Sequence, residues 1–275
     1  MLNQVTTLIT SDKAVANNEL RLSICLRSNG FSFSVTTLDQ VLLTFGDVDF
    51  NLTLPLGEQT QALKDFFASQ GISIFGLRQA ELIVPSDHFV WIPRHLHDAV
   101  RNRQYLRMVS NPDSALGAYH LLVPALESYI VFTAPTSVVT AFKLAIPGID
   151  VHCQHSALAA GTMLQRSRLH PIVMMHVRGS KADFAAFYSG QLLLSTTFEA
   201  LNDQSRLFHA IDVMKRLHLE TPDMELAISG DVGREIFAIL QHYFPSVSLY
   251  TGRPVTFVNP QFQTLPTYRY ALLLS

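Results

Sequence analysis

Two stretches of alternating apolar and polar residues constrain the fold more than any other feature of the sequence. In the first, from Leu20 to Phe45, apolar residues recur at every second position in two successive runs, as in strands with one buried face. Ser28-Asn29-Gly30 separates these runs and predicts a tight turn, and a third apolar run covers Val41 to Phe45. The stretch therefore predicts a meander of three antiparallel strands.

The second stretch, Ile172 to Thr197, repeats this order of strands and turns. Arg178-Gly179-Ser180 ends its first strand, and Ser189-Gly190 separates the next two. Each stretch is followed by a segment of helical period, Glu58 to Gln70 in the first half and Asn202 to His218 in the second. The repetition predicts a duplicated α/β fold with two lobes.

The two lobes are expected to span residues 1–169 and 170–275. Polar residues dominate Met1 to Glu19, which is expected to be a frayed arm or an added edge strand. The helix expected from Arg94 to Val109 would turn Leu96, Val100 and Leu106 inward. Further expected strands are Leu82–Val84, Phe89–Ile92, Tyr119–Val123, Tyr129–Thr133, Ile149–Cys153, Leu226–Ser229, Val247–Tyr250 and Tyr268–Leu274, and further helices are Thr136–Ile146, Ser156–Arg166 and Arg234–Phe244. Residues near 93–135 are extra elements of the first lobe.

Composition excludes several classes of protein. The 275 residues are 48% hydrophobic and only 15% charged, so the chain can bury a large core. A formal net charge of −2 provides no general attraction for nucleic acid or an anionic membrane. Two cysteines cannot form a disulfide framework, and neither a signal peptide nor a membrane span is evident. We expect a cytoplasmic protein that binds no nucleic acid and inserts into no membrane.

Several phrases resemble an uncharacterised bacterial family, domain of unknown function 3822, over nearly the whole chain. They are LSICLRSNGFSFSV, FVWIPRHLHD, VMMHVRGSKADFAAFYSGQLLLSTTFEA and AISGDVG. The family is described as having an actin-like ATPase fold, and the duplicated order of elements is that of the sugar kinase, Hsp70 and actin superfamily. The resemblance implies two lobes, each a mixed sheet of a three-stranded antiparallel meander plus parallel strands with flanking helices, but it implies no established activity.

The resemblance also identifies a candidate nucleotide cleft. Members of the superfamily hold phosphate and magnesium with two Asp-x-Gly hairpins, whose places here are taken by Ser28-Asn29-Gly30 and Val177-Arg178-Gly179, with Ser180 following. Both hairpins keep a glycine and lack the aspartate. A glycine in a turn that needs positive φ explains both positions without any ligand, and we favour that structural interpretation. The expected cofactor is therefore none, with weak ATP binding as the alternative.

The adenosine-binding turn of the superfamily corresponds to Gly230-Asp231-Val232-Gly233, where Asp231 replaces the second glycine of a pair. In the functional interpretation, the backbone at Gly230, Asp231 and Gly233 approaches a nucleotide at a helix start. In the structural interpretation, which we favour, Asp231 caps the helix and Gly230 makes the bend.

Histidines occur at two places in the sequence where a chemical role is conceivable. His152, Cys153 and His155 lie close together but lack the further ligands that a closed zinc site needs, so no metal is expected. His176 interrupts an apolar strand and is expected to be a hydrogen-bonded core histidine and not a general base.

One basic segment is a candidate partner-binding surface. It carries Arg94, Arg101, Arg103 and Arg107, together with His95 and His97, against a single acidic residue, Asp98. Arginines of this kind can grip carboxylates of an acidic protein partner, although such a cluster can equally be a solvated helix face. The low charged fraction would also allow a homodimer.

Two functions remain open at this point. In the first, which we favour, the chain is a noncatalytic actin-like binding or scaffold protein with degenerate phosphate hairpins. In the alternative, it is an active ATPase or small-molecule kinase whose carboxylates come from elsewhere, for example from Asp183, Asp212 or Asp231.

Overall fold

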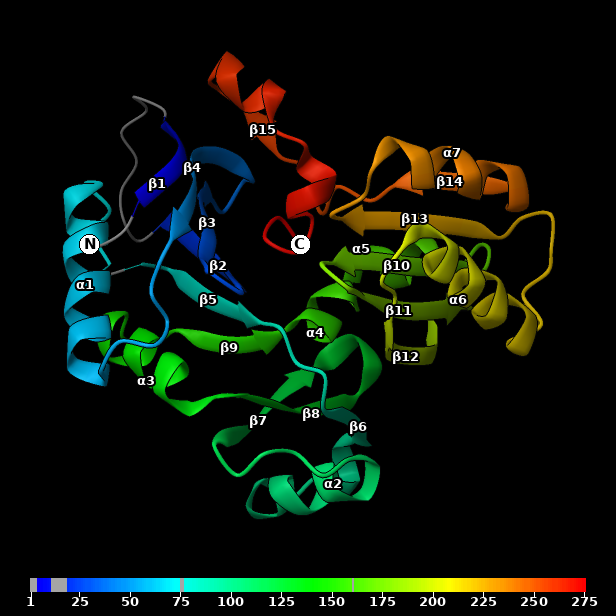
Figure 1. Ribbon diagram of the computed structural model, residues 1–275, viewed down its shortest axis with the longest axis horizontal. Helices are drawn as coiled ribbons and strands as arrows, with labels where there is room; N and C mark the ends of the chain where they lie inside the picture. Colours follow the sequence, from blue (N-terminus) through cyan, green and yellow to red (C-terminus); the bar gives the residue numbers. More distant parts are fainter. Residues whose placement is uncertain (1–3, 11–18, 75–76, 160) are drawn as a thin grey trace. The chain divides into compact units, whose positions relative to one another are not determined.

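The computed structural model describes residues 4–10, 19–74, 77–159 and 161–275 (Figure 1). They form two compact units. Unit 1 comprises the described residues of Met1–Leu122, Ser128–Gln154 and Pro254–Leu265, and unit 2 comprises those of Val123–Glu127, His155–Arg253 and Pro266–Ser275. These units are defined by internal contacts, whereas the boundary between residues 169 and 170 concerns the duplicated pattern and stays a prediction.

Unit 1 is built on a seven-stranded sheet around the first meander. Its strands are β1 (Gln4–Thr10), β2 (Leu20–Arg27), β3 (Gly30–Thr37), β4 (Val41–Asp49), β5 (Gln79–Val84), β9 (Asp150–Cys153) and β15 (Thr256–Phe257). Neighbours are β1-β4-β3-β2-β5-β9, with β15 also paired to β4. β2, β3 and β4 are antiparallel, while β5 and β9 continue the sheet as parallel strands.

Unit 2 is built on a five-stranded sheet around the second meander. Its strands are β10 (Ile172–Arg178), β11 (Lys181–Tyr188), β12 (Gln191–Glu199), β13 (Glu225–Gly230) and β14 (Ser246–Leu249). The order is β12-β11-β10-β13-β14, antiparallel within the meander and parallel from β10 onward. This order is the same as β4-β3-β2-β5-β9 in unit 1. The predicted duplication is confirmed, and the two meanders lie in separate sheets.

The helices follow the same repeated order. They are α1 (Leu56–Ser69), α2 (Asn102–Val109), α3 (Thr136–Ala145), α4 (Gln154–Leu158), α5 (Gly161–Arg166), α6 (Asp203–Arg216) and α7 (Arg234–Tyr243). α1 follows β4 as α6 follows β12, and α3 precedes β9 as α7 precedes β14. Asn202 caps α6, because its side chain accepts a hydrogen bond from the Ser205 backbone N–H.

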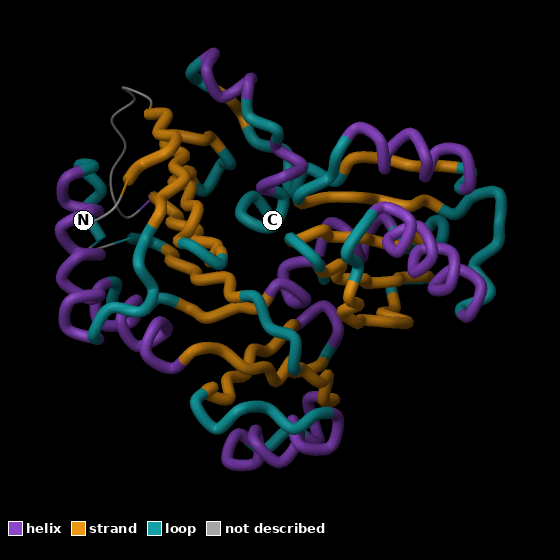
Figure 2. The backbone as a smooth tube through the Cα atoms, in the orientation of Figure 1, coloured by secondary structure: helices purple, strands orange, loops and turns teal. Residues whose placement is uncertain are grey.

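Phenylalanine rings close one face of the unit 1 sheet. Phe31, on β3, is fully buried, and its ring lies 5.7 Å from Phe66 of α1 and 5.6 Å from Phe142 of α3. Phe33 and Phe67 extend the cluster. α1 and α3 therefore cover the same sheet face, as Figure 2 shows for the two helices beside the orange strands.

In unit 2, helices cover both sheet faces. The odd-numbered residues of β10 pack with Ala210 and Val213 of α6 and with Ile236 and Leu240 of α7. The opposite face meets α4 and α5, through His155 and Arg166 respectively. Phe208 lies off the buried stripe of α6: its side chain is 64% exposed, whereas Ala210 and Val213 of the same helix are buried in the core.

Residues 85–135 form an insert between β5 and α3. Its three-stranded sheet has the order β6-β8-β7, with β6 (Phe89–Pro93), β7 (Leu116–Val123) and β8 (Ser128–Pro135). Three short 3₁₀ helices occur here: η2 (Arg94–Leu96), η3 (Ala99–Arg101) and η4 (Pro124–Leu126). α2 packs on this sheet through the buried Leu106.

The predicted continuous helix from Arg94 to Val109 is wrong. His97 is extended, and the Asp98 carboxylate accepts a hydrogen bond from the Val100 N–H, so the chain starts a new turn there. As a result Leu96 and Val100 are 61% and 93% exposed instead of inward. Leu106 alone of the three expected core residues is buried.

The ends of the chain also depart from a simple repeat. Residues 4–10 are an edge strand, β1, whereas residues 1–3 and 11–18 of the predicted arm lie outside the described residues. The strand predicted from Tyr268 to Leu274 is wrong, because Thr267–Tyr270 is a 3₁₀ helix, η6, and its turn continues into Leu274 by a hydrogen bond to the Tyr270 carbonyl. A further 3₁₀ helix, η5, covers Pro260–Thr264. Among the helices of the described ranges, none is long and apolar enough to cross a membrane.

Replacing Phe31 by Ala should lower the free energy of unfolding by about 3–5 kcal/mol, because it removes a fully buried ring and leaves a cavity between β3, α1 and α3. Urea unfolding followed by circular dichroism measures the change. Phe208→Ala, at an exposed position of α6, is the matched control and should have little effect. Equal losses for both variants would contradict the described core.

Candidate functional site

The hairpin of unit 1 ends in an arginine that is paired with carboxylates of β4. Arg27 is the last residue of β2, and its guanidinium lies 3.3 Å from Asp47 and 3.8 Å from Asp49. The Ser32 hydroxyl, on β3, donates to Asp47, and the Asn29 amide donates to Asp49 over 2.9 Å. Thus the carboxylates next to the turn are neutralised and hydrogen-bonded within the unit.

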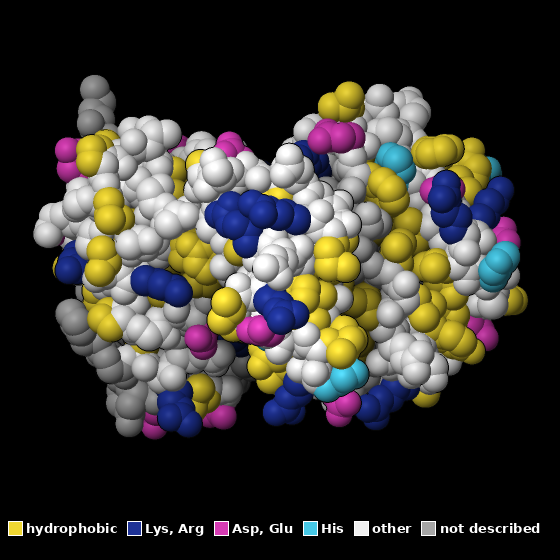
Figure 3. Space-filling view, turned by 90° about the horizontal axis from the view of Figure 1, so that it is seen from below, with side chains coloured by type: hydrophobic (Ala, Val, Ile, Leu, Met, Phe, Trp, Pro, Cys, Tyr) yellow, Lys and Arg dark blue, Asp and Glu magenta, His cyan; other side chains and the backbone are white. Residues whose placement is uncertain are grey.

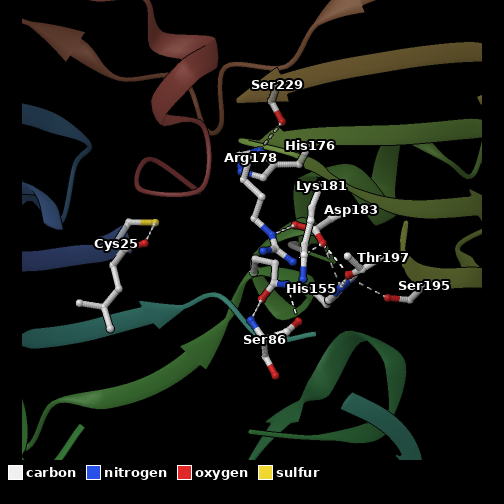
Figure 4. A network of polar contacts seen from close by, with 12 residues as sticks. Cys25, Ser86, His155, His176, Arg178, Lys181, Asp183, Ser195, Thr197 and Ser229 are labelled. Carbon is white, nitrogen blue, oxygen red and sulfur yellow. Dashed lines mark hydrogen bonds and ion pairs between the residues drawn. The ribbon is translucent and has the colours of Figure 1, made fainter. Parts of the chain in front are cut away.

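The hairpin of unit 2 has the same arrangement with a fully buried carboxylate. Arg178 ends β10 and donates from Nε to Asp183 over 2.7 Å and from a terminal nitrogen over 3.1 Å. The Thr197 hydroxyl, on β12, donates to Asp183 over 2.6 Å. Burial alone would raise the pKa of the Asp183 carboxyl, but the bonds from Arg178 and the nearby His155 outweigh it and hold that pKa below its ordinary value. Figure 4 shows these side chains converging on Asp183.

Strand register makes the two arrangements equivalent. Ser32 of β3 faces Asp47 of β4, and Asp183 of β11 faces Thr197 of β12. The carboxylate and the hydroxyl have therefore exchanged strands between the units, while the arginine keeps its place at the end of the first strand. The sequence alone did not identify Arg27, Asp47 or Thr197, because their proximity depends on which residues the strands bring opposite each other.

The register also relates the two predicted hairpin triplets. Arg27 pairs with Gly30 across the turn Ser28-Asn29, and Arg178 pairs with Lys181 across the turn Gly179-Ser180. Ser28-Asn29-Gly30 is thus offset by two positions from the structural equivalent of Val177-Arg178-Gly179. Gly179 has φ +56°, as its turn requires, and a Cβ on Gly30 would lie 2.0 Å from the Val48 carbonyl oxygen. Both glycines have a structural reason.

His155 extends the buried polar cluster of unit 2. It lies on α4 with no exposed surface, and its Nε2 is 3.0 Å from the Thr197 hydroxyl and 3.6 Å from Asp183. Its Nδ1 lies 2.9 Å from the Ser195 hydroxyl (Figure 4). Both ring nitrogens are therefore engaged by strand side chains, and the cluster ties α4 to β11 and β12.

His176 is the core histidine that the sequence predicts. Its Nδ1 lies 2.9 Å from the Ser229 hydroxyl on the adjacent strand, and the residue is 7% exposed. Burial, opposed in part by Asp183, lowers the pKa of His176 to about 4. The imidazole is therefore neutral at pH 7 and serves as a hydrogen-bonding link between β10 and β13.

The Gly230 turn is packed by its own chain. A Cβ on Gly230 (φ +86°) would lie 2.0 Å from the Val177 carbonyl oxygen, so the close approach to β10 requires glycine. The expectation that Asp231 caps the following helix is wrong: the N-cap of α7 is Gly233, which has no side chain to bond. Asp231 instead forms a 2.9 Å ion pair with Arg269 of η6, which packs against β13.

The other predicted groups also have internal partners. His152 lies on β9, where burial lowers its pKa and the neighbouring Glu81 opposes this shift. Glu81 is itself buried and bonded to Arg21 and Ser23 of β2, each over 2.6 Å. His152 and His155 thus contact different side chains. No group of three metal-ligating side chains is found in the part of the chain that the structure describes.

The four predicted arginines of the insert lie in different environments. Arg94 and Arg107 are exposed, and Arg101 contacts Asp98 at 3.3 Å. Arg103 is half-buried, and its guanidinium donates to the Leu116 carbonyl over 2.7 Å. Arg103 therefore has a structural role, and Arg94, Arg101 and Arg107 remain available at the surface.

A family model described as a protein of unknown function, DUF3822, matches residues 11–247. The chain belongs to the DUF3822 family. No curated protein matches it in sequence.

Solved structures show that this DUF3822 chain has the actin-like ATPase fold. A protein of unknown function from Bacteroides thetaiotaomicron with that fold is 21% identical, with a TM-score of 0.71 over 94% of this chain and 97% of that one. A chain in a PilM–PilN type IV pilus biogenesis complex is 10% identical, with a TM-score of 0.56 over 94% and 97%. The predicted fold and family are both confirmed.

In the DUF3822 chain, His176 should titrate with a midpoint near pH 4 by NMR, because burial disfavours the imidazolium. Since its folded pKa lies below the ordinary value of about 6.5, its contribution to stability is present above pH 6.5 and is lost as the pH falls towards 4. His176→Gln should remove this part of the pH dependence of unfolding. A midpoint near 6.5 in the wild type would contradict the burial described.

Replacing Asp183 by Asn should lower the free energy of unfolding by about 3–5 kcal/mol, because the Arg178 guanidinium would lose the carboxylate that neutralises it inside unit 2. Thermal and urea unfolding at pH 7 measure the loss. Asp212→Asn is the matched control, since Asp212 pairs with the exposed Arg216 on α6 and should matter little. A stable Asp183→Asn variant would contradict a structural role for this cluster.

Proposed function

We propose that the chain is a noncatalytic actin-like protein that acts by binding another protein. The observation that carries the proposal is the arginine at the end of the first strand in each unit. Arg27 and Arg178 neutralise the carboxylates Asp47 and Asp183, which lie on strands beside the two hairpin turns. A carboxylate that is paired in this way would have to give up its arginine before it could hold magnesium and its waters, which is the task that phosphoryl transfer requires.

The other two carboxylates considered for an active ATPase or kinase, Asp212 and Asp231, support the same proposal. Asp212 is paired with Arg216 on α6, and Asp231 is paired with Arg269 on η6. In an active ATPase or kinase, one of these groups would have to exchange its arginine for a metal. Gly30, Gly179 and Gly230 also have ordinary structural explanations, so none of these three glycines requires a nucleotide as its reason.

A binding role is compatible with the fold. One solved chain of similar fold belongs to a complex of two proteins, PilM and PilN. In the present chain, the exposed Arg94, Arg101 and Arg107 provide a surface that suits an acidic protein.

The purified chain should show no magnesium-dependent ATP hydrolysis above the level of an Asp231→Ala variant, because the groups that would hold the metal are occupied. Phosphate release at millimolar ATP and magnesium measures this. Steady turnover in the wild type that Asp231→Ala abolishes would overturn the proposal. Isothermal titration distinguishes a third outcome: tight ATP binding without turnover would replace the scaffold role by nucleotide sensing.

A further inference from the structure

The insert carries an outward surface that combines apolar and basic side chains. We call it the insert patch and define it by Val100, Arg101, Gln104, Arg107 and Met108. Gln104, Arg107 and Met108 share the outer face of α2 at helical spacing. Val100 and Arg101 are the last two residues of η3, which directly precedes α2. Val100 is 93% exposed and Met108 80% exposed, whereas Leu106 on the inner face is fully buried. Hydrophobic and basic side chains lie beside one another where the insert faces the viewer in Figure 3.

Two further apolar side chains close to the insert patch in the sequence are also exposed. Leu96 and Val109 flank the insert patch and are 61% and 56% exposed. Single exposed hydrophobic residues are normal on a protein surface, but a group of neighbours rimmed by charge is typical of a binding surface. Burying Val100 and Met108 under a partner would favour binding, because it would remove apolar surface from water.

The charge of the insert patch is positive and only partly compensated. Within Arg94–Val109 the single acidic residue is Asp98, which contacts Arg101 at 3.3 Å in an exposed pair. Among the described residues, no hydrogen bond or ion pair of the Arg94 or Arg107 guanidinium is found. Arginine can grip a carboxylate with two parallel hydrogen bonds, so these side chains suit an acidic partner.

Contacts beneath the insert patch hold it in one conformation. The Asn102 amide, on the buried side of α2, bonds to His97 over 3.0 Å and to His120 over 2.8 Å. The His97 ring stacks on Tyr129 at 3.9 Å. In addition, the Tyr105 hydroxyl donates a hydrogen bond to the Leu96 carbonyl and accepts one from the Asp98 N–H. A preformed surface lowers the entropic cost of binding.

We propose that the insert patch binds an amphipathic segment of another protein, in which acidic residues flank an apolar stripe. This deepens the proposed function by naming the chemistry of the partner. A second copy of the chain fits less well, because a two-fold contact through this patch would bring arginines against arginines. An anionic membrane also fits less well, since the chain has a net charge of −2 and α2 has only eight residues.

Photocrosslinking in the native cell tests the proposal directly. A benzoylphenylalanine at position 104, the centre of the insert patch, should crosslink to one protein. The crosslinked peptide, sequenced by mass spectrometry, should contain Asp or Glu interleaved with apolar residues. The matched control is the same probe at Gln204, an exposed glutamine on α6, which should not give this product. A crosslink to a second copy of the chain, to lipid only, to a peptide without acidic residues, or to nothing would overturn the proposal.

Two double variants then separate the charged and apolar contributions. Arg101→Ser with Arg107→Ser should reduce the crosslink yield about tenfold, with a larger effect at low salt. Val100→Ser with Met108→Ser should reduce it at every salt concentration, because the apolar contact is lost. All four side chains are exposed, so both variants should keep the wild-type melting temperature. Unchanged yields in either variant would refute the insert patch as the contact.

ATP hydrolysis, measured on the same preparations, keeps the two proposals distinguishable. A chain that crosslinks through position 104 and also hydrolyses ATP would refute the noncatalytic role and leave the insert patch intact. A chain that does neither would refute the insert patch alone.

Discussion

Each sheet must bury the apolar face that its alternating strands create, and this requirement shapes the rest of the molecule. In unit 1, α1 and α3 cover that face through a cluster of phenylalanine rings centred on Phe31. In unit 2, α6 and α7 cover the corresponding face through smaller side chains such as Val173 and Ile228. The two units cover the same sheet face with different residues. They therefore share the order of strands and helices but not the sequence of the core.

The opposite sheet faces hold the polar side chains, and there burial demands that each charge has a partner. Arg21 and Glu81 satisfy each other in unit 1, as Arg178 and Asp183 do in unit 2. The exchange of carboxylate and hydroxyl between Ser32–Asp47 and Asp183–Thr197 shows that this requirement can be met in more than one way. Such a site is stable as it is, and a metal or a phosphate would have to displace internal bonds in order to enter.

The insert differs from both repeats in what it leaves exposed. Asn102 and Leu106 anchor α2 from below, whereas Val100 and Met108 face outward. In the insert, the residues that hold α2 in place are therefore different from those that are exposed. If the insert binds a partner as proposed, a substitution at Val100 or Met108 can change binding without changing the packing of the sheets.

The sequence by itself determined the elements whose signals are local. Alternation predicted both meanders, turn residues predicted the turns at Ser28-Asn29-Gly30 and Arg178-Gly179-Ser180, and the helical period from Asn202 predicted the start of α6. These features could be predicted because strand period, turn chemistry and capping depend on neighbours a few residues apart.

Only the tertiary structure decided which distant side chains meet. Asp47 reaches Arg27, and His155 reaches Asp183, through strand register and helix packing that no local pattern encodes. The helix expected from Arg94 is interrupted at His97 and Asp98, where the Asp98 carboxylate accepts from the Val100 N–H and the Tyr105 hydroxyl donates to the Leu96 carbonyl. The Asn102 amide also bonds to His120 of β7. Helix preference is worth only a fraction of a kcal/mol per residue, so a few such hydrogen bonds override the apolar period at Leu96 and Val100.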